Sequence, residues 1–149
     1  RHMAIEVILN LLIGKSSNLY KKLYEEQILL GEADSEYEFS NQYAHILISG
    51  QSNNPQLVQD MLITEIEKLK NNGFVVEDFE RMKRKIYGEF VTEFNDVASI
   101  SRMFLADTVK QINSFDYVDE YDNITMEYAK ELLNEVFVED KMVLSVIKN

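Results

Sequence analysis

The stretch SEYEFSNQYAHILISG, residues 35–50, constrains the fold most, because its side chains alternate between two kinds with a period of two. The two sets are Tyr37, Phe39, Ala44, Ile46 and Ile48 on one side, and Glu36, Glu38, Tyr43, His45 and Leu47 on the other. Successive side chains of a strand point to opposite faces of a sheet. Asn41-Gln42 can join the two halves as a turn, so the stretch predicts a hairpin with one dry and one wet face.

The rest of the chain has mostly helical spacing. We predict a helix opened by Ser16 or Ser17 and running to Leu30, one from Pro55 to Asn72, one from Glu77 to about Phe94, one after Asn95-Asp96, and one capped by Thr125. Ala4–Ile13 (AIEVILNLLI) fits a helix or a strand equally well. MVLSVI, residues 142–147, predicts a closing strand that joins the hairpin, since an isolated hairpin is marginal.

This order of elements predicts an α+β fold: a small, mainly antiparallel sheet with helices packed on one face. The length of 149 residues fits one domain. Arg1-His2-Met3 reads as an expression-tag remnant, so we place the single domain at residues 4–149 and exclude the first three residues from the fold. His45 is then the one native histidine.

Composition excludes several kinds of site. The chain has no cysteine, which excludes disulfides, thiol catalysis and cysteine zinc sites, and a single native histidine excludes a two-histidine metal site. The net charge of -11 disfavours nucleic acid and anionic membrane surfaces. No apolar run is long enough for a membrane span, and no signal peptide is present, so we expect a cytoplasmic protein.

Gly14-Lys15-Ser16 raises the question of a phosphate-binding loop. The Walker A pattern needs a glycine at the position that Leu9 occupies, and it needs a strand before the loop and a helix after it. We therefore favour a helix break at Gly14, with Ser16 or Ser17 capping the next helix.

Two charged stretches have simple interpretations. DYVDEYD, residues 116–122, lacks the spacing and the turn glycine of a calcium loop and predicts a solvated acidic loop. The basic residues within 81–85 predict an ion-paired helix surface, with Glu77–Arg81 and Glu80–Arg84 at i, i+4 spacing; an anionic contact patch is the alternative.

Glu36 and Glu38 project to one face of their predicted strand, and His45 lies on the same face as Tyr43 in the other strand. Paired carboxylates can perform acid–base chemistry when they converge on a substrate. A hydrated sheet face accounts for them as well, since antiparallel sheets commonly leave one side in water.

Five segments in order resemble one known family. They are LLIGKSSNLYKKLYEEQILL, EYEFSNQYAHILISGQSNNP, GFVVEDFERMKRKIYGEFVTEFND, NITMEYAKELLNEVF and MVLSVI. The series is similar to the C-terminal half of zinc proteases of the pitrilysin, insulinase and mitochondrial processing peptidase family, and it covers nearly all of residues 4–149. The resemblance implies a domain truncated at its N-terminal side, with a sheet that lacks a strand encoded before Ala4.

The resemblance also implies where the zinc chemistry lies. In that family two halves close around a chamber, and an HxxEH motif with a later glutamate binds zinc in the N-terminal half. This sequence has no HxxEH, so no catalytic or metal residue is assigned to it and zinc is expected in the N-terminal half. Many members also carry an arginine and a tyrosine that reach the substrate; Tyr24 and Gly31 occupy those positions here.

The expected function is that of a non-catalytic C-terminal domain of a zinc-dependent endopeptidase that walls a peptide-degrading chamber. Glu36, Glu38, Tyr43 and His45 are the residues expected to face peptide. Expected partners are the N-terminal half of the same protein and a related protease chain as heterodimer or homodimer, with this chain on the zinc-bearing side of a bacterial two-chain type. The alternatives are an assembly subunit of a protease-like complex without zinc chemistry, and a binding module that dimerises through a sheet edge.

Overall fold

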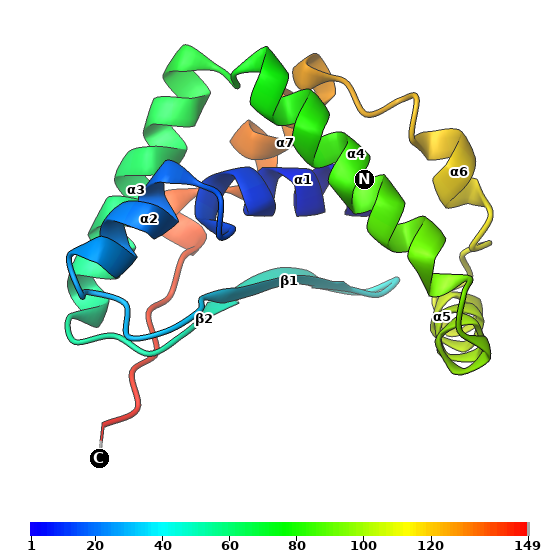
Figure 1. Ribbon diagram of the computed structural model, residues 1–149, viewed down its shortest axis with the longest axis horizontal. Coiled ribbons are helices and arrows are strands. Elements are labelled where there is room, and N and C mark those ends of the chain that lie inside the picture. The colour runs from blue at the N-terminus through cyan, green and yellow to red at the C-terminus, as the bar shows by residue number, and fades with distance from the viewer. Residues whose placement is uncertain (149) are drawn as a thin grey trace.

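Helix α1, His2–Ile13, lies at the centre of the molecule and settles the ambiguous apolar run as a helix. The computed structural model describes residues 1–148 and places the other helices around α1 and the hairpin beneath it (Figure 1). Eight of the twelve residues of α1 are buried. A helix that is apolar on nearly all sides belongs in a core.

Residues 2 and 3 belong to this helix, so the prediction that they lie outside the fold is wrong. Met3 retains only 5% of its exposure and is part of the main apolar cluster. The apolar pattern of α1 extends by one turn towards the N-terminus, and that turn packs on the hairpin through the ring of His2. The His2 ring lies 5.0 Å from that of Phe39 between centroids.

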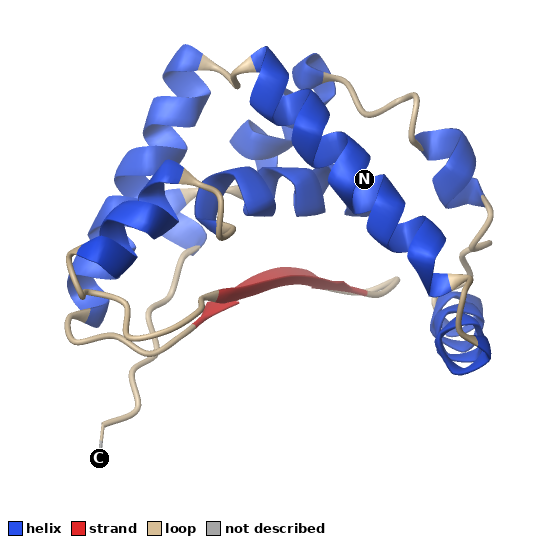
Figure 2. Ribbon diagram, viewed as in Figure 1, coloured by secondary structure: helices blue, strands red, loops and turns tan. Residues whose placement is uncertain are grey.

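The hairpin forms as the alternation predicts. Strands β1, Asp34–Phe39, and β2, Ala44–Ser49, pair antiparallel, with Tyr37 opposite Ile46. Tyr37 is buried, and Phe39, Ile46 and Ile48 pack against the same apolar cluster. Figure 2 shows the strands along one side of the molecule and the helices on the other, which confirms helices packed on one face of a small antiparallel sheet.

Four of the helices begin at side-chain caps. The helices after α1 are α2 Asn18–Glu25, α3 Pro55–Asn72, α4 Val76–Glu93, α5 Val97–Val109, α6 Asp116–Glu120 and α7 Met126–Val136, followed by the short η1 Glu139–Lys141. Ser17, Asn54, Asp96 and Thr125 each accept a hydrogen bond from a backbone N–H in the first turn of the helix that follows. α3 ends at Gly73, whose φ of 77° favours glycine.

Four expectations need correction. α2 ends at Glu25, well before Leu30, and residues 116–120 form the short helix α6 where we expected a loop. On α4, Arg81 pairs with Asp78 at 2.9 Å, so the predicted Glu77–Arg81 pair is wrong, and no Glu80–Arg84 pair occurs within residues 1–148.

The predicted closing strand is also wrong for the described chain. After η1, residues 142–148 follow no regular structure, and within residues 1–148 the sheet contains β1 and β2 alone. Val143 and Ile147 are 91% and 95% exposed. A strand needs a neighbour with free backbone groups directly beside it, and residues 142–147 have no such neighbour in contact.

A buried polar cluster joins α5 to α6. The Asp107 carboxyl accepts hydrogen bonds from Ser114 Oγ at 2.6 Å and from the Tyr117 hydroxyl at 3.3 Å. Asp107 and Ser114 are 7% and 2% exposed. Partial burial, together with the nearby Asp107, raises the pKa of the Tyr117 hydroxyl above its ordinary value.

This raised pKa predicts a loss of stability at alkaline pH. Above about pH 10 the tyrosine of the unfolded chain loses its proton while folded Tyr117 keeps it, so deprotonation favours the unfolded state. The stabilisation is complete below that pH and declines as pH rises further. We expect the free energy of unfolding to fall less steeply above about pH 10 in Tyr117→Phe than in the unmodified chain. Tyr43→Phe, at an exposed site, is the control; equal slopes in all three proteins would contradict this account.

Candidate functional site

The outward face of the hairpin gathers the four residues that the sequence analysis expects to face peptide. Because strand side chains alternate, Glu36 and Glu38 of β1 share this face with His45 and Leu47 of β2, opposite the face that covers α1. Glu38 lies directly opposite His45 in the register. Each of these side chains is exposed, so the predicted wet face is confirmed, whereas its contact with peptide stays a prediction.

Tyr43 continues this face at the turn. Its backbone carbonyl accepts a hydrogen bond from the N–H of Ser40 at 2.8 Å, which closes the turn around Asn41-Gln42. The rings of Tyr43 and His45 stack, with 5.9 Å between centroids and 28° between planes. The turn therefore holds an aromatic pair beside the Glu38 carboxylate; Tyr43 is 57% exposed.

Lys110, at the end of α5, is the member of this site that sequence reasoning missed. Its Nζ lies 3.9 Å from Glu38 Oε2 and 4.3 Å from the centroid of the Phe39 ring. A cation over an aromatic face and beside a carboxylate is favourable on both counts. Nothing in the local pattern around Lys110 marks it, because its partners lie in a distant part of the sequence.

The outward face offers acceptors and rings, but its carboxylates and its imidazole do not converge as the ligands of a metal site do. Within residues 1–148, no three side chains among His, Cys, Asp and Glu come together in a way that could hold a metal ion. The side chains of these described residues therefore do not fit a zinc ion. Exposed carboxylates beside stacked aromatic rings suit the binding of cationic and extended polypeptide groups.

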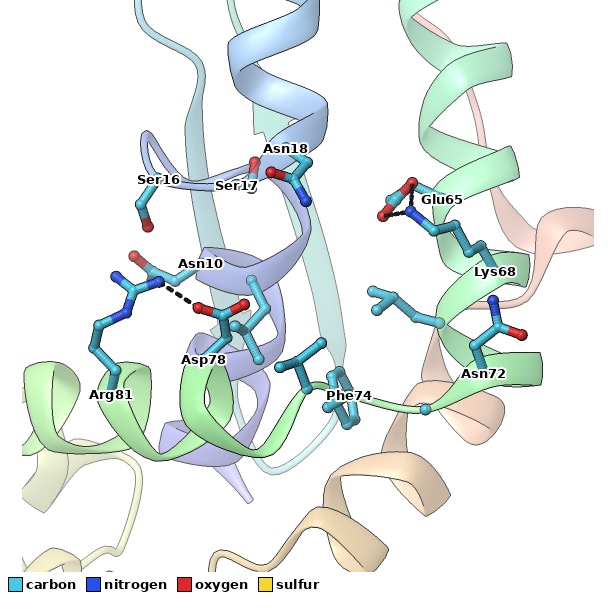
Figure 3. Close-up of a pocket in the computed structure, with 14 residues that line it drawn as sticks. Asn10, Ser16, Ser17, Asn18, Glu65, Lys68, Asn72, Phe74, Asp78 and Arg81 are labelled. Atoms are coloured by element: carbon cyan, nitrogen blue, oxygen red, sulfur yellow. Dashed lines mark hydrogen bonds and ion pairs between the residues drawn. The ribbon is translucent and has the colours of Figure 1, made fainter.

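Ser16 and Ser17 border a separate polar cavity of about 320 Å³, which lies between the end of α1, the start of α2, the C-terminal half of α3 and the start of α4. Figure 3 shows Ser16, Ser17 and Asn18 at one side of it, with the Arg81–Asp78 and Lys68–Glu65 ion pairs at the others. Arg81 and Lys68 are thus already paired with the carboxylates of Asp78 and Glu65.

The helix-break interpretation of Gly14 is confirmed. A Cβ at Gly14 would lie 2.5 Å from the Asn10 carbonyl oxygen, so the chain leaves α1 where only glycine fits. Lys15 points to Glu32, with its Nζ 2.8 Å from Oε1, and Ser17 Oγ accepts the N–H of Tyr20 at 3.0 Å. A helix precedes the loop, the Lys15 ammonium is paired with Glu32, and the Ser17 hydroxyl caps α2. This segment is therefore not a phosphate-binding loop.

No helix among residues 1–148 has the length and apolar character that crossing a membrane requires.

Comparisons with known proteins agree with this fold and with the resemblance. In solved structures, the chain is similar to an M16-like peptidase from Alicyclobacillus acidocaldarius, with a TM-score of 0.88 and 23% identity over 95% of this chain and 34% of that one. It is 24% identical over 145 residues to the uncharacterized zinc protease YmfH of Bacillus subtilis (strain 168), which covers 95% of this chain and 33% of YmfH. The chain thus spans about a third of the length of these relatives. The profile described as "Peptidase M16 inactive domain" matches residues 1–86, and the chain therefore belongs to this family of inactive domains of M16 peptidases.

Proposed function

We propose that this chain is a non-catalytic domain of a zinc-dependent endopeptidase, and that the outward hairpin face forms part of the wall against which peptide lies. The observation that carries the proposal is the separation of the two faces of the hairpin. The helices pack on the inner face of the hairpin (Figure 2). Glu36, Glu38, Tyr43 and His45 are all exposed, and the strand alternation places them on the outer face. The family, and the description of YmfH as a zinc protease, support a place for the domain within a peptidase.

The chemistry of the face supports peptide contact without catalysis. A peptide chain presents backbone N–H groups, cationic side chains and apolar surface, and the face offers carboxylate acceptors and an aromatic pair to match them. Binding energy from groups that are remote from the reacting bond helps to orient a substrate. In this proposal zinc and the catalytic base come from the part of the protein outside this chain.

The test uses the complete protein that contains this domain. The variant combines Glu36→Gln, Glu38→Gln, Tyr43→Ala and His45→Ala, and the measurement is kcat/KM for a panel of peptides. Loss of several substrate contacts predicts a fall of about threefold or more, which corresponds to about 0.65 kcal/mol. We expect the fall to be greatest for peptides rich in lysine and arginine, because two carboxylates are removed.

A matched control carries the same carboxylate changes on the helical side, Glu77→Gln and Glu131→Gln, both at exposed positions. It should leave kcat/KM unchanged. Equal kinetics for the outward-face variant and the control would remove this face from peptide binding. A complete protein that assembles but turns over no peptide would favour the role of an assembly subunit.

A further inference from the structure

Glu36 and Glu38 have different surroundings, although they share the outward face of the hairpin. They are two residues apart on β1, so roughly 6–7 Å separates their backbone positions along the strand. Glu38 has a cation beside it, since the Lys110 Nζ lies 3.9 Å from its Oε2. Among residues 1–148, Glu36 has no ion-pair partner. The face therefore has one open carboxylate and one beside which a lysine of the same chain already lies.

The Lys110 ammonium also lies against an aromatic ring, with its Nζ 4.3 Å from the centroid of Phe39. Glu38 and Phe39 point to opposite faces of β1, because they are neighbours on a strand. β2 pairs along one edge of β1, so a group that contacts both side chains lies at the other edge or at the turn. Figure 1 shows α5 at the turn end of the hairpin, which the Lys110 contact joins to it. The Glu38 carboxylate and the Phe39 ring together form a place that suits a cation, which we call the cation position.

The backbone of Lys110 is fixed by the way in which α5 ends. Lys110 is the C-terminal cap of the helix, and Gln111 follows it with a φ of 60°. The N–H of Gln111 donates to the Thr108 carbonyl at 3.1 Å, and the N–H of Ile112 donates to the Asp107 carbonyl at 2.8 Å. These two hydrogen bonds are those of a Schellman motif, in which a residue in the left-handed conformation ends the helix. The Lys110 side chain, which is only 25% exposed, thus starts from a defined place.

The last turn of α5 is also anchored through the side chain of Asp107, three residues before Lys110. The Asp107 carboxyl accepts hydrogen bonds from Ser114 Oγ and from the Tyr117 hydroxyl. Tyr117 packs in turn against the main apolar cluster. Lys110 is therefore presented to the hairpin by a helix end that is fastened to the rest of the fold.

The contact between Lys110 and Glu38 itself is loose enough to be exchanged. A charge-assisted hydrogen bond has about 2.7–2.9 Å between nitrogen and oxygen, and 3.9 Å is well beyond that distance. The Glu38 side chain is 47% exposed, and exposed ion pairs contribute little to stability. A cationic side chain of a bound peptide can take the place of Lys110 at Glu38 without disturbing the fold, but it has to compete with Lys110.

We propose that Lys110 determines the specificity of the outward face by occupying the cation position formed by Glu38 and Phe39. A lysine or arginine of the peptide that approaches this position meets an ammonium that repels it and already uses the carboxylate. Glu36 remains the carboxylate that receives a cationic side chain. The face thus accepts one cationic side chain at Glu36 and disfavours another at Glu38. This inference rests on the proposed function and adds to it the charge pattern of the peptide that the face accepts.

The test compares Lys110→Met with the parent in the complete protein that contains this domain. The substrates are peptides of one sequence in which lysine or acetyllysine is placed at each position in turn, since acetylation removes the charge of lysine. The measured quantity is the ratio of kcat/KM for the lysine peptide to that for the acetyllysine peptide. At the peptide position that meets Glu38, this ratio should rise about threefold or more in Lys110→Met, because the competing cation is gone. The rise should become smaller at high salt.

Two further variants separate this effect from a change in fold or in net charge. Lys110→Arg keeps a cation beside Glu38 and should keep the parental ratio. Lys70→Met removes one positive charge from an ion pair of similar exposure on α3, where Lys70 is 16% exposed and its partner Glu67 is 51% exposed. This variant should also keep the parental ratio. A merely structural role of Lys110 would lower kcat/KM for both members of each peptide pair alike and leave their ratio unchanged.

The remaining outcomes distinguish this inference from the proposed function. An unchanged ratio in Lys110→Met at every peptide position, with lower kcat/KM in the four-residue variant of the outward face, would overturn this inference and leave the proposed function standing. A fall in kcat/KM for peptides with glutamate in place of glutamine, without a rise for lysine, would show that Lys110 itself binds acidic groups of the peptide. Unchanged kinetics in both the four-residue variant and Lys110→Met would overturn both proposals.

Discussion

Replacement of Leu12 by alanine should lower the free energy of unfolding by about 2–5 kcal/mol, the usual cost of truncating a fully buried leucine. Leu12 has 0% exposure in the main apolar cluster, on the helix around which the other elements pack. The mutation removes apolar surface from the core and leaves a cavity, because α1 contacts elements on several sides and cannot move towards one without leaving another. Urea unfolding of the 149-residue chain, followed by circular dichroism, measures the change.

Leu11→Ala is the matched control for that experiment. Leu11 is also a leucine on α1, but it is only partly buried and borders the polar cavity shown in Figure 3. Leu11→Ala should therefore lower the free energy of unfolding by less than Leu12→Ala does. Equal losses for both variants would mean that α1 is not enclosed as described.

Replacement of Asp107 by alanine should cost about 1–3 kcal/mol of stability, even though the new side chain is apolar. The reason is the state of its partners: Ser114 Oγ and the Tyr117 hydroxyl both donate to the Asp107 carboxyl, and Ser114 is 2% exposed. Without the carboxyl, the buried Ser114 hydroxyl loses its acceptor while remaining shielded from water. Thermal unfolding of the variant, compared with the parent chain, provides the measurement.

Asp119→Ala serves as the comparison, since Asp119 lies exposed on the adjacent helix α6. That change should stay within about 0.5 kcal/mol of the parent. The double variant Asp107→Ala with Ser114→Ala should recover part of the lost stability, because it also removes the buried Ser114 hydroxyl that has no acceptor. No recovery would show that packing, rather than the unpaired hydroxyl, determines the cost.

Local patterns in the sequence predicted the elements whose structure is determined locally. The two-residue alternation of 35–50 identified the hairpin, its turn and its exposed face, and Asn54-Pro55 with Gly73 identified both ends of α3. Side-chain period and capping depend on residues within one or two turns of one another, so they are visible in the sequence.

The sequence was ambiguous or misleading where the structure of a segment depends on contacts with residues far away in the chain. Ala4–Ile13 is apolar at nearly every position, so no period distinguishes helix from strand, and only burial among α4, α7 and the hairpin shows that it is a helix. Residues 142–147 have a strand sequence but no paired neighbour within residues 1–148. Lys110 reaches the candidate site through Glu38 and Phe39, a contact between distant segments that no short motif encodes.

The enclosure of α1 has a consequence for synthesis on the ribosome. α1 precedes α7 in the chain, yet α7 packs directly against it. At about 5–20 residues per second, the interval between the emergence of Ile13 and that of Met126 is roughly 6–23 s. During that time α1, whose one ionisable side chain after His2 is that of Glu6, lacks the contacts with α7 that bury part of its apolar surface. Nascent chains of this protein are therefore expected to engage chaperones that hold apolar segments, and to release them only once residues 126–136 have left the exit tunnel.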